Sequence, residues 1–441
     1  MSSQLLSTGA PAYEENRGAF NLLLDQRPAA IALPASAAEV SEAIAAAKSR
    51  GLRVATQRTG HGADPLRSLE QALLIRTAGL TEVEIDAEAR SARVGAGALW
   101  SDLVPSASEQ GLAGLHGSTG TVGITGYMLG GGLGWYGRKH GLGCNSVTAV
   151  ELVSADGEAR RVDRENEPEL FWALRGGGGD FGVVTALEFD LLPVAEVFAG
   201  ALFFPLERAG ETLGAWLEWI AGVPDEVTSV GRVMAFPPFP EIPEPLRGNS
   251  FAVVEAVHLG DEESGSELLA PLRGLEPAID TFAAQPPAGI SELHMDPPEP
   301  GPALGDGMLL GELDAAALEA WLAVVGPGTD SPLVSVELRH IGGALGRSEA
   351  GCGVLGSVPG SFLQFAIGAV PEPALREPVL GRIAELAATM APWSAGRYRS
   401  FSMTPVAVSE VLPAESCERL RAVKAEYDPE GLFLSNQPLS G

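Results

Sequence analysis

The chain has 441 residues, of which 45% are hydrophobic and 20% are charged, and 57 acidic against 29 basic residues give a formal net charge of −28. This length exceeds one compact core, so we expect two or three domains, with two intertwined domains as the favoured arrangement. The negative charge repels phosphate backbones and anionic lipid surfaces, and no apolar run approaches the ~20 residues of a membrane span, so neither nucleic acid nor a membrane is an expected partner.

The first part of the chain is predicted to run from a helix into a strand and then a loop. Its N-terminus lacks the basic and apolar segments of a secretory signal, which indicates a cytoplasmic protein. Ser36–Glu39 matches a capping box, so we expect a helix from there to Gly51 and a strand at 52–56. The strand leads into His61, which stands between two glycines. The helix has one apolar face, formed by Val40, Ala43, Ile44 and Ala47.

Short strands and one further helix follow this loop. Apolar runs at 72–75 and 92–94 and a helical stretch at 99–109 give an α+β pattern rather than a regular βαβ winding. The cysteines are far apart and lack C-x-x-C spacing, which indicates neither a disulfide framework nor a zinc site. We expect no bound metal and buried free thiols at Cys144, Cys352 and Cys417.

A hairpin and one more strand complete this part of the chain. Asp-Gly at 156–157 tolerates the positive φ of a tight turn, so the flanking segments 147–153 and 158–162 are predicted to pair. Another strand is predicted at 182–192 and ends at Pro193. A domain boundary is therefore expected near residue 195.

Beyond this boundary the composition changes. Proline-rich loops separate helices from strands, and the chain is expected to return to the first domain close to its end. Helices are predicted at 213–220 and 315–325, and strands at 251–259 and 333–341.

Two glycine clusters, at 130–134 and 176–179, lack Cβ atoms over whole segments. Such segments either let backbone N–H groups approach a phosphate or form tight turns, and each cluster alone leaves both interpretations open. Residues 132–137 also match G-x-G-x-x-G, but that motif has meaning only between a strand and a helix. Arg138 and the residues after it do not look like a helix start, so a Rossmann interpretation is rejected.

Four motifs in order along the chain resemble the berberine-bridge-enzyme-like FAD-linked oxidases, a family of the vanillyl-alcohol-oxidase flavoproteins. They are Thr59–Gly62, Thr121–Gly134, Arg175–Val184 and Tyr427–Phe433. The resemblance spans nearly the whole chain. It implies an α+β fold with a two-subdomain PCMH-type FAD-binding domain and a substrate domain whose antiparallel sheet is covered by helices. We expect these at 1–195 and 196–399, with 400–441 returning to the FAD-binding domain.

The resemblance also implies the cofactor-binding residues. The segment 57–63 matches the pyrophosphate loop, and His61 matches the residue bonded to the flavin 8α-methyl group, for which a neutral imidazole is a competent nucleophile. The implied FAD-binding set is Gln57, Arg58, Thr59, Gly60, His61, Gly62, Ala63, Gly117, Ser118, Thr121, Val122, Gly123, Thr125, Gly126, Tyr127, Gly131, Gly132, Leu133, Gly134, Val183, Val184 and Asn436.

Some relatives bind the flavin a second time through a cysteine, at a position that is Thr119 in this chain. Because Cys144 is some twenty residues further on, a single covalent bond through His61 is predicted. Two other departures from the family pattern are Thr59 for a usual glycine and Gly431 for a frequent asparagine, and neither removes a side chain that the flavin chemistry needs.

The catalytic base is the weak point of the resemblance. In this family a substrate gives hydride to flavin N5 while a base, often tyrosine or glutamate, removes a proton. The position of the second aromatic residue in the family's Y-x-N-Y segment is Phe401, which cannot accept a proton. Tyr398 lies three residues earlier, and on an extended strand that offset would point it to the opposite face. Tyr398 and Tyr127 are the candidate catalytic residues, and for Tyr398 a packing role is the favoured alternative.

Further candidates have structural alternatives. Alternation along a predicted strand places Glu337 and Arg339 on one face and His340 on the other. These residues either belong to the active site or have structural roles. In the structural case, Glu337 and Arg339 form an ion pair across the sheet, and His340 is a buried, hydrogen-bonded histidine. His116 either lies near the flavin or is a loop histidine bonded to backbone.

The leading hypothesis is an FAD-dependent oxidase that transfers hydride from a small, fairly apolar metabolite to flavin N5, with O2 as electron acceptor. The substrate class would be an alcohol, phenol or amine of secondary metabolism. The alternative is a redox-neutral cyclase or isomerase that uses the flavin pocket as a chamber, motivated by Phe401. A non-catalytic flavin-binding protein and an NADPH-using reductase are further alternatives with less support in the sequence.

Overall fold

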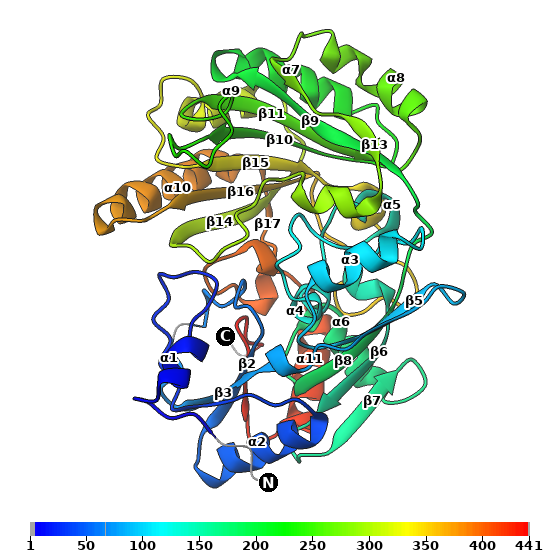
Figure 1. The fold of residues 1–441 in the computed structure, drawn as a ribbon, viewed down its shortest axis with the longest axis vertical. Helices are drawn as coiled ribbons and strands as arrows, with labels where there is room; N and C mark the ends of the chain where they lie inside the picture. The colour runs from blue at the N-terminus through cyan, green and yellow to red at the C-terminus, as the bar shows by residue number, and fades with distance from the viewer. Residues whose placement is uncertain (1–4, 67, 440–441) are drawn as a thin grey trace.

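The computed structural model describes residues 5–66 and 68–439, and its strands within these residues form three sheets (Figure 1). The smallest sheet is parallel, in the order β1-β3-β2-β18. Its strands are β1 (Ala30–Ala32), β2 (Arg53–Gln57), β3 (Ala72–Arg76) and β18 (Phe433–Leu434).

Helix α2 (Ala37–Ser49) packs on this sheet as the sequence predicts. Its N-cap is Ser36, whose hydroxyl accepts a hydrogen bond from the Glu39 N–H at 3.3 Å. The predicted apolar face is buried because these side chains contact β1, β2 and β3. Its members are Val40, Ala43, Ile44 and Ala47.

The second sheet is antiparallel, in the order β4-β5-β8-β6-β7. Its strands are β4 (Val83–Asp86), β5 (Ser91–Gly95), β6 (Val147–Val153), β7 (Ala159–Asp163) and β8 (Val183–Asp190). The predicted hairpin is confirmed, because β6 pairs with β7 and Gly157 in the turn has φ +86°. The helices in and around its core are α3 (Trp100–Ser108), α4 (Ile124–Leu129), α6 (Pro168–Gly177) and α11 (Ala414–Tyr427).

The third sheet is antiparallel and has nine strands. They follow the order β12-β9-β11-β10-β15-β16-β14-β17, with β13 also paired to β9. The strands are β9 (Val197–Pro205), β10 (Val227–Ala235), β11 (Ser250–His258), β12 (Ile279–Asp280), β13 (Ala283–Gln285), β14 (Ala303–Leu310), β15 (Ser335–His340), β16 (Phe362–Ala369) and β17 (Ser394–Gly396).

One face of this sheet is covered by helices and the other faces the rest of the molecule (Figure 1). The expected antiparallel sheet with a helical cover is therefore confirmed. The covering helices are α7 (Ala209–Ile220), α8 (Glu262–Arg273), α9 (Ala315–Val325) and α10 (Arg376–Met390). We keep 1–195, 196–399 and 400–441 as proposed domain limits.

The C-terminal segment returns to the first sheet, where Phe433 of β18 lies opposite Val54 of β2. The buried Asp428 carboxylate fixes the turn before β18 by accepting hydrogen bonds from the Leu432 and Phe433 N–H groups at 2.6 and 2.9 Å. Gly431 in this turn has φ +64°, a left-handed conformation that suits both glycine and asparagine, which explains why either residue fits this position.

Two sequence predictions need correction. Gly137–His140 form one helical turn, α5 (coloured cyan in Figure 1), where no helix was expected, although the Rossmann motif still lacks its strand because α4 precedes Gly132. Cys352 is only partly buried, unlike Cys144 and Cys417. Over the described residues, no helix combines the length and apolar character needed to cross a bilayer.

Candidate functional site

The site begins in the loop after β2, at the carboxyl end of the parallel sheet, where ligands bind in many α/β proteins. The Gln57 amide donates a hydrogen bond to the Gly18 carbonyl at 3.1 Å. Gly60 has φ +81°, and a Cβ there would lie 2.7 Å from Gln57 Nε2 and 2.9 Å from Ala19, so only glycine fits. The C-terminal tail closes the loop, since Asn436 Nδ2 donates to the Gly62 carbonyl at 2.7 Å.

His61 is held in this loop by two contacts. Its ring stacks on Phe20 with centroids 3.7 Å apart, and its Nδ1 is hydrogen-bonded to Thr59 Oγ1 at 2.8 Å. Burial lowers the pKa of His61 to about 4, although Asp296 acts in the opposite direction. The imidazole is therefore neutral near pH 7.

Arg58 within the loop and Arg76 at the end of β3 both donate to backbone carbonyls rather than to carboxylates. Arg58 Nε donates to the Gly97 carbonyl at 2.5 Å and Arg76 Nη1 to the Gly18 carbonyl at 3.0 Å. Burial and the neighbouring Arg58 lower the pKa of Arg76 to about 10, and Arg76 Nε is buried without a partner among the described residues. Such a pair fits a diphosphate. Sequence reasoning missed Arg76, although its place at the end of the strand beside β2 was a usable signal.

The glycine-rich segment 130–134 approaches its surroundings at close range. Gly131 and Gly132 have φ +128° and +76°, and a Cβ on Gly131 would lie 2.2 Å from the Tyr398 hydroxyl. A Cβ on Gly134 would lie 2.0 Å from the His116 carbonyl oxygen and 2.6 Å from the Tyr127 hydroxyl. These contacts require glycine and bring the two candidate tyrosines to one backbone segment.

Buried polar atoms without partners surround this segment. Over the described residues, the Tyr127 hydroxyl and His116 Nε2 have no hydrogen-bond partner, while His116 Nδ1 is bonded to the Gly117 carbonyl at 2.9 Å. Burial lowers the pKa of His116 to about 4, since its backbone hydrogen bond opposes the shift only in part, and burial raises the pKa of Tyr398 well above its usual range. Unsatisfied buried groups are costly, so a polar ligand such as FAD fits here.

The face of the nine-stranded sheet that lies opposite the glycine-rich segment carries a buried ionic cluster. We define this cluster as Arg232, Glu255, His294, Glu337 and Arg339. Arg339 Nε donates to Glu337 Oε1 at 2.6 Å, so both lie on one face of β15, as predicted. The next residue along β15, His340, is bonded instead to Arg138, with 3.0 Å between His340 Nε2 and Arg138 Nη1. The predicted ion pair is thus present, within a larger cluster that sequence reasoning missed because its members are spread along the chain.

The expected opposition of Tyr398 and Phe401 is wrong. Arg399–Phe401 form a 3₁₀ turn, closed by the Phe401 N–H donating to the Tyr398 carbonyl at 3.0 Å, rather than an extended strand. Residues three apart in such a turn lie on the same side, and the two rings are 6.0 Å apart. The Arg339 guanidinium lies 5.0 Å from the Phe401 ring centroid, which connects this turn to the ionic cluster.

The other predicted cofactor residues divide into three groups. Gly123 lies against Arg58, and Ser118 Oγ donates to Asp296 at 2.6 Å, so both belong to the assembled site. Val183 and Val184 are buried in hydrophobic cores around β8. The remaining predicted residues lie on or beside α4 and the glycine-rich segment. They are Gly117, Thr121, Val122, Thr125, Gly126 and Leu133, whereas Ala63 lies in the loop with His61.

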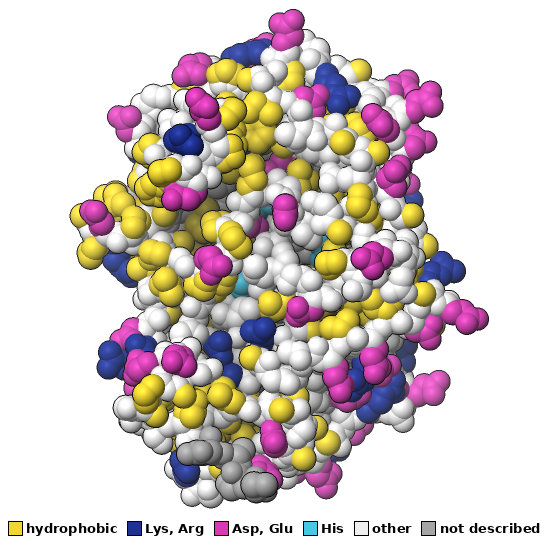
Figure 2. All heavy atoms as spheres, in the orientation of Figure 1, with side chains coloured by type: hydrophobic (Ala, Val, Ile, Leu, Met, Phe, Trp, Pro, Cys, Tyr) yellow, Lys and Arg dark blue, Asp and Glu magenta, His cyan; other side chains and the backbone are white. Residues whose placement is uncertain are grey.

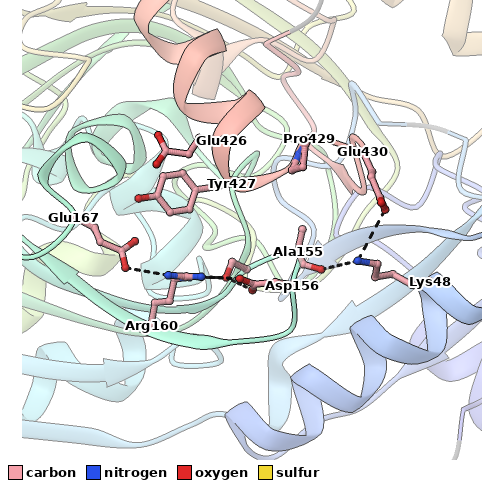
Figure 3. A pocket seen from close by; sticks show the side chains of 10 residues that line it. Lys48, Ala155, Asp156, Arg160, Glu167, Glu426, Tyr427, Pro429 and Glu430 are labelled. Atoms are coloured by element: carbon pink, nitrogen blue, oxygen red, sulfur yellow. Dashed lines mark hydrogen bonds and ion pairs between the residues drawn. The ribbon is translucent and has the colours of Figure 1, made fainter.

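A cavity of about 430 Å³ lies elsewhere, between α2, the β6–β7 hairpin and the end of α11 (Figure 3). Its cations are already paired: Arg160 contacts Asp156 at 2.6 Å and Glu167 at 3.1 Å, and Lys48 contacts Glu430 at 3.9 Å. We assign it no role. Acidic side chains are scattered over the face shown in Figure 2, and histidines are visible in the hollow between the two halves.

Residues 28–163 match the family model described as an FAD binding domain. The chain is 28% identical to (R)-6-hydroxynicotine oxidase of Paenarthrobacter nicotinovorans, over 93% of this chain and 91% of that protein. It is 29% identical to chitooligosaccharide oxidase of Gibberella zeae, over 60% of this chain and 52% of that protein.

Two solved structures share the fold over nearly their whole length. BBE-like 1 of Physcomitrella patens has a TM-score of 0.85 at 20% identity, covering 99% of this chain and 97% of that one. Berberine bridge enzyme of Eschscholzia californica has a TM-score of 0.83 at 21% identity, with the same coverage of 99% and 97%. The chain is an FAD-linked oxidoreductase with a PCMH-type FAD-binding fold, and it is similar to the berberine-bridge-enzyme-like oxidases that its motifs resemble.

Proposed function

We propose that the protein oxidises a small, fairly apolar metabolite, an alcohol, phenol or amine, with O2 as the electron acceptor. FAD, held by the loop 57–63, would supply the hydride acceptor and the route by which electrons reach O2. The observation that carries the proposal is that the glycine-rich segment, with the unpartnered Tyr127 hydroxyl beside it, faces the ionic cluster of the nine-stranded sheet, since Gly134 and Arg339 line one small cavity. A cytoplasmic location and a place in secondary metabolism belong to the same proposal and rest on the sequence.

The chain's residues have separable tasks in this proposal. Arg58 and Arg76 bind the diphosphate, and the loop 57–63 closed by Asn436 holds it in place. Leu133, Ile341 and Leu345 pack together beside β15 and give the site an apolar wall that excludes water. Glu337 and Arg339 lie on the sheet face, where a carboxylate can accept a proton and a guanidinium can orient the substrate. The relative named for 6-hydroxynicotine supports an amine among the substrate classes.

Anaerobic addition of candidate substrates to the purified yellow protein tests this function. An alcohol, phenol or amine that is a substrate will bleach the visible flavin absorbance, and admission of air will restore it with release of hydrogen peroxide. Absorbance that stays unchanged over a broad panel of the three classes would count against the proposal.

We also propose that FAD is attached covalently through His61 alone. The neutral imidazole and its hydrogen bond to Thr59 support the attachment, and Cys144 is engaged elsewhere, with its Sγ 3.7 Å from the Leu355 carbonyl oxygen. After acid precipitation the flavin should stay with the wild-type chain and with a His258→Ala control, whereas His61→Ala should release it. Flavin that remains bound to precipitated His61→Ala would refute the assignment.

The redox-neutral cyclase or isomerase remains the second candidate, favoured by Phe401 in the position of the family's tyrosine. Turnover that continues without O2 and with chemically reduced flavin would select it over the oxidase.

A further inference from the structure

We propose that His294 is a positioning residue of the active site, which holds Glu337 and Arg339 in fixed orientations on the sheet face. The proposal rests on the oxidase function proposed above. His294 does not belong to the sheet, because it lies between the 3₁₀ turn Pro287–Glu292 and β14 and enters the ionic cluster from outside.

Both ring nitrogens of His294 contact carboxylates. Nδ1 lies 2.6 Å from Glu255 Oε2 on β11, and Nε2 lies 2.8 Å from Glu337 Oε2 on β15. A carboxylate beside each ring nitrogen favours the doubly protonated imidazolium electrostatically, because only that form of histidine carries a positive charge. The geometry therefore points to a charged His294 bridging two strands.

Charged side chains of both signs surround the ring nitrogens of His294. Arg232 Nη1 and Arg339 Nη2 lie 3.3 and 3.0 Å from Nε2, and Arg232 also donates to Glu255. Burial and Arg232 lower the pKa of His294, but Glu255 and Glu337 outweigh them and leave it above its usual value. Asp296, two residues further on, acts on Arg339, so three carboxylates face three cations.

The consequence for Glu337 is a carboxylate with a cation beside each oxygen. Oε1 accepts from Arg339 Nε, while Oε2 lies 2.8 Å from His294 Nε2 and has no hydrogen-bond partner among the described residues. Burial raises the pKa of Glu337, but Arg339 and His294 lower it by more, and it lies well below its usual range. Arg339 uses Nε and Nη2 in the cluster, which leaves Nη1 to meet a substrate acceptor.

The backbone supports the same conclusion independently. Met295 has φ +56°, a left-handed conformation that is strained for a residue other than glycine. This turn sends His294 toward the sheet and Asp296 toward Ser118 of the flavin site. The Trp135 ring, next to the glycine-rich segment, packs edge-on against His294 with centroids 6.0 Å apart. One short segment therefore contacts both halves of the site.

Proton NMR of the flavin-loaded wild-type protein tests the hydrogen bonds without any substrate. Imidazolium N–H protons bonded to carboxylates resonate far downfield, and two such signals are expected to persist through neutral pH. Both should disappear in His294→Gln, and one should disappear in Glu337→Gln. Both should remain in the control His258→Gln, a histidine of β11 that bonds Ser264 instead. A wild-type spectrum without these signals would overturn the proposal.

The pH dependence of anaerobic flavin reduction tests the positioning role. In His294→Gln, Glu337 loses a cationic neighbour and its pKa rises, so the acidic limb of the profile should move to higher pH. The rate of reduction should fall by roughly 10- to 100-fold because the two side chains lose their fixed orientation, while FAD content stays unchanged. A folded variant with an unmoved profile would show that the role is only structural. If no substrate reduces the flavin, the oxidase function fails while the NMR spectra still decide the bonding of His294.

Discussion

Thr59 occupies a position where the family usually has glycine, and its hydroxyl bonds the ring nitrogen of His61. The bond fixes the orientation of the imidazole beside Phe20. Removal of the hydroxyl should therefore lower the fraction of covalently bound FAD in Thr59→Val by slowing the attachment, whereas Thr59→Ser should attach FAD like the wild type. The flavin that remains with the acid-precipitated chain measures this fraction over time. Equal time courses for the two variants would show that the hydroxyl has no role.

His116 makes the stability of the protein depend on pH. Because its folded pKa of about 4 lies below the ordinary 6.5, the unfolded chain takes up the proton first as pH falls. The group therefore removes stability between pH 6.5 and 4, by about 3 kcal/mol in the limit. His116→Gln has no imidazole to take up this proton. The denaturant midpoint of its unfolding should therefore fall less on acidification than that of the wild type. Parallel midpoints from pH 7 to pH 4 would contradict the assignment.

For single residues, the sequence predicts membership of the site where the residues share one continuous motif. It does not predict membership for residues that are distant in the chain and become neighbours only in the folded structure. The loop around His61 is continuous in the chain, so its assembly could be predicted. His294, Glu255 and Arg232 come from three separate segments, and nothing local indicates that they converge. Tyr398 was misjudged because a 3₁₀ turn of three residues has no periodicity that a sequence pattern can reveal.

The glycine-rich segment that follows α4 depends on the absence of side chains. Gly131→Ala adds a Cβ that would lie 2.2 Å from the Tyr398 hydroxyl at φ +128°. We expect a loss of roughly 2 kcal/mol or more in stability, with reduced FAD content. Gly381→Ala, in α10 with nothing within 4 Å of the added Cβ, should be neutral or slightly stabilising. Thermal unfolding and the flavin-to-protein absorbance ratio measure both effects, and similar values for the two variants would contradict the prediction.

Elements with a long apolar period were predictable from the sequence. Helix α2 and helix α9 agree with their predicted ranges to within a few residues, because burial of one face fixes both the period and the ends. Helix α5 was missed because it is a single turn in a glycine-rich segment, where no apolar face exists to reveal it.

Asp428 fixes the turn that precedes β18, the strand by which the C-terminal segment pairs with β2. Its buried carboxylate accepts hydrogen bonds from two backbone N–H groups and from Lys424 Nζ at 2.7 Å. Asp428→Asn places an amide N–H against these donors and should cost about 2 to 4 kcal/mol, with loss of FAD because β18 and Asn436 are displaced. The exposed neighbour Glu426→Gln should leave both properties unchanged. Denaturant unfolding and flavin retention on gel filtration measure them, and an Asp428→Asn protein as stable as this control would contradict the assigned role.

The contact between Asn436 and Gly62 spans 374 positions of the chain. During synthesis at about 5 to 20 residues per second, Asn436 is therefore added to the chain roughly 20 to 75 s after Gly62. Over that interval β2 exposes the edge that β18 will occupy, and an exposed strand edge is prone to pair with other chains. Chains that end before β18 would keep this edge unpaired and would lack the Asn436 contact that closes the flavin loop. Such chains would not retain FAD, so the yellow colour of the flavin would identify the molecules whose translation was completed.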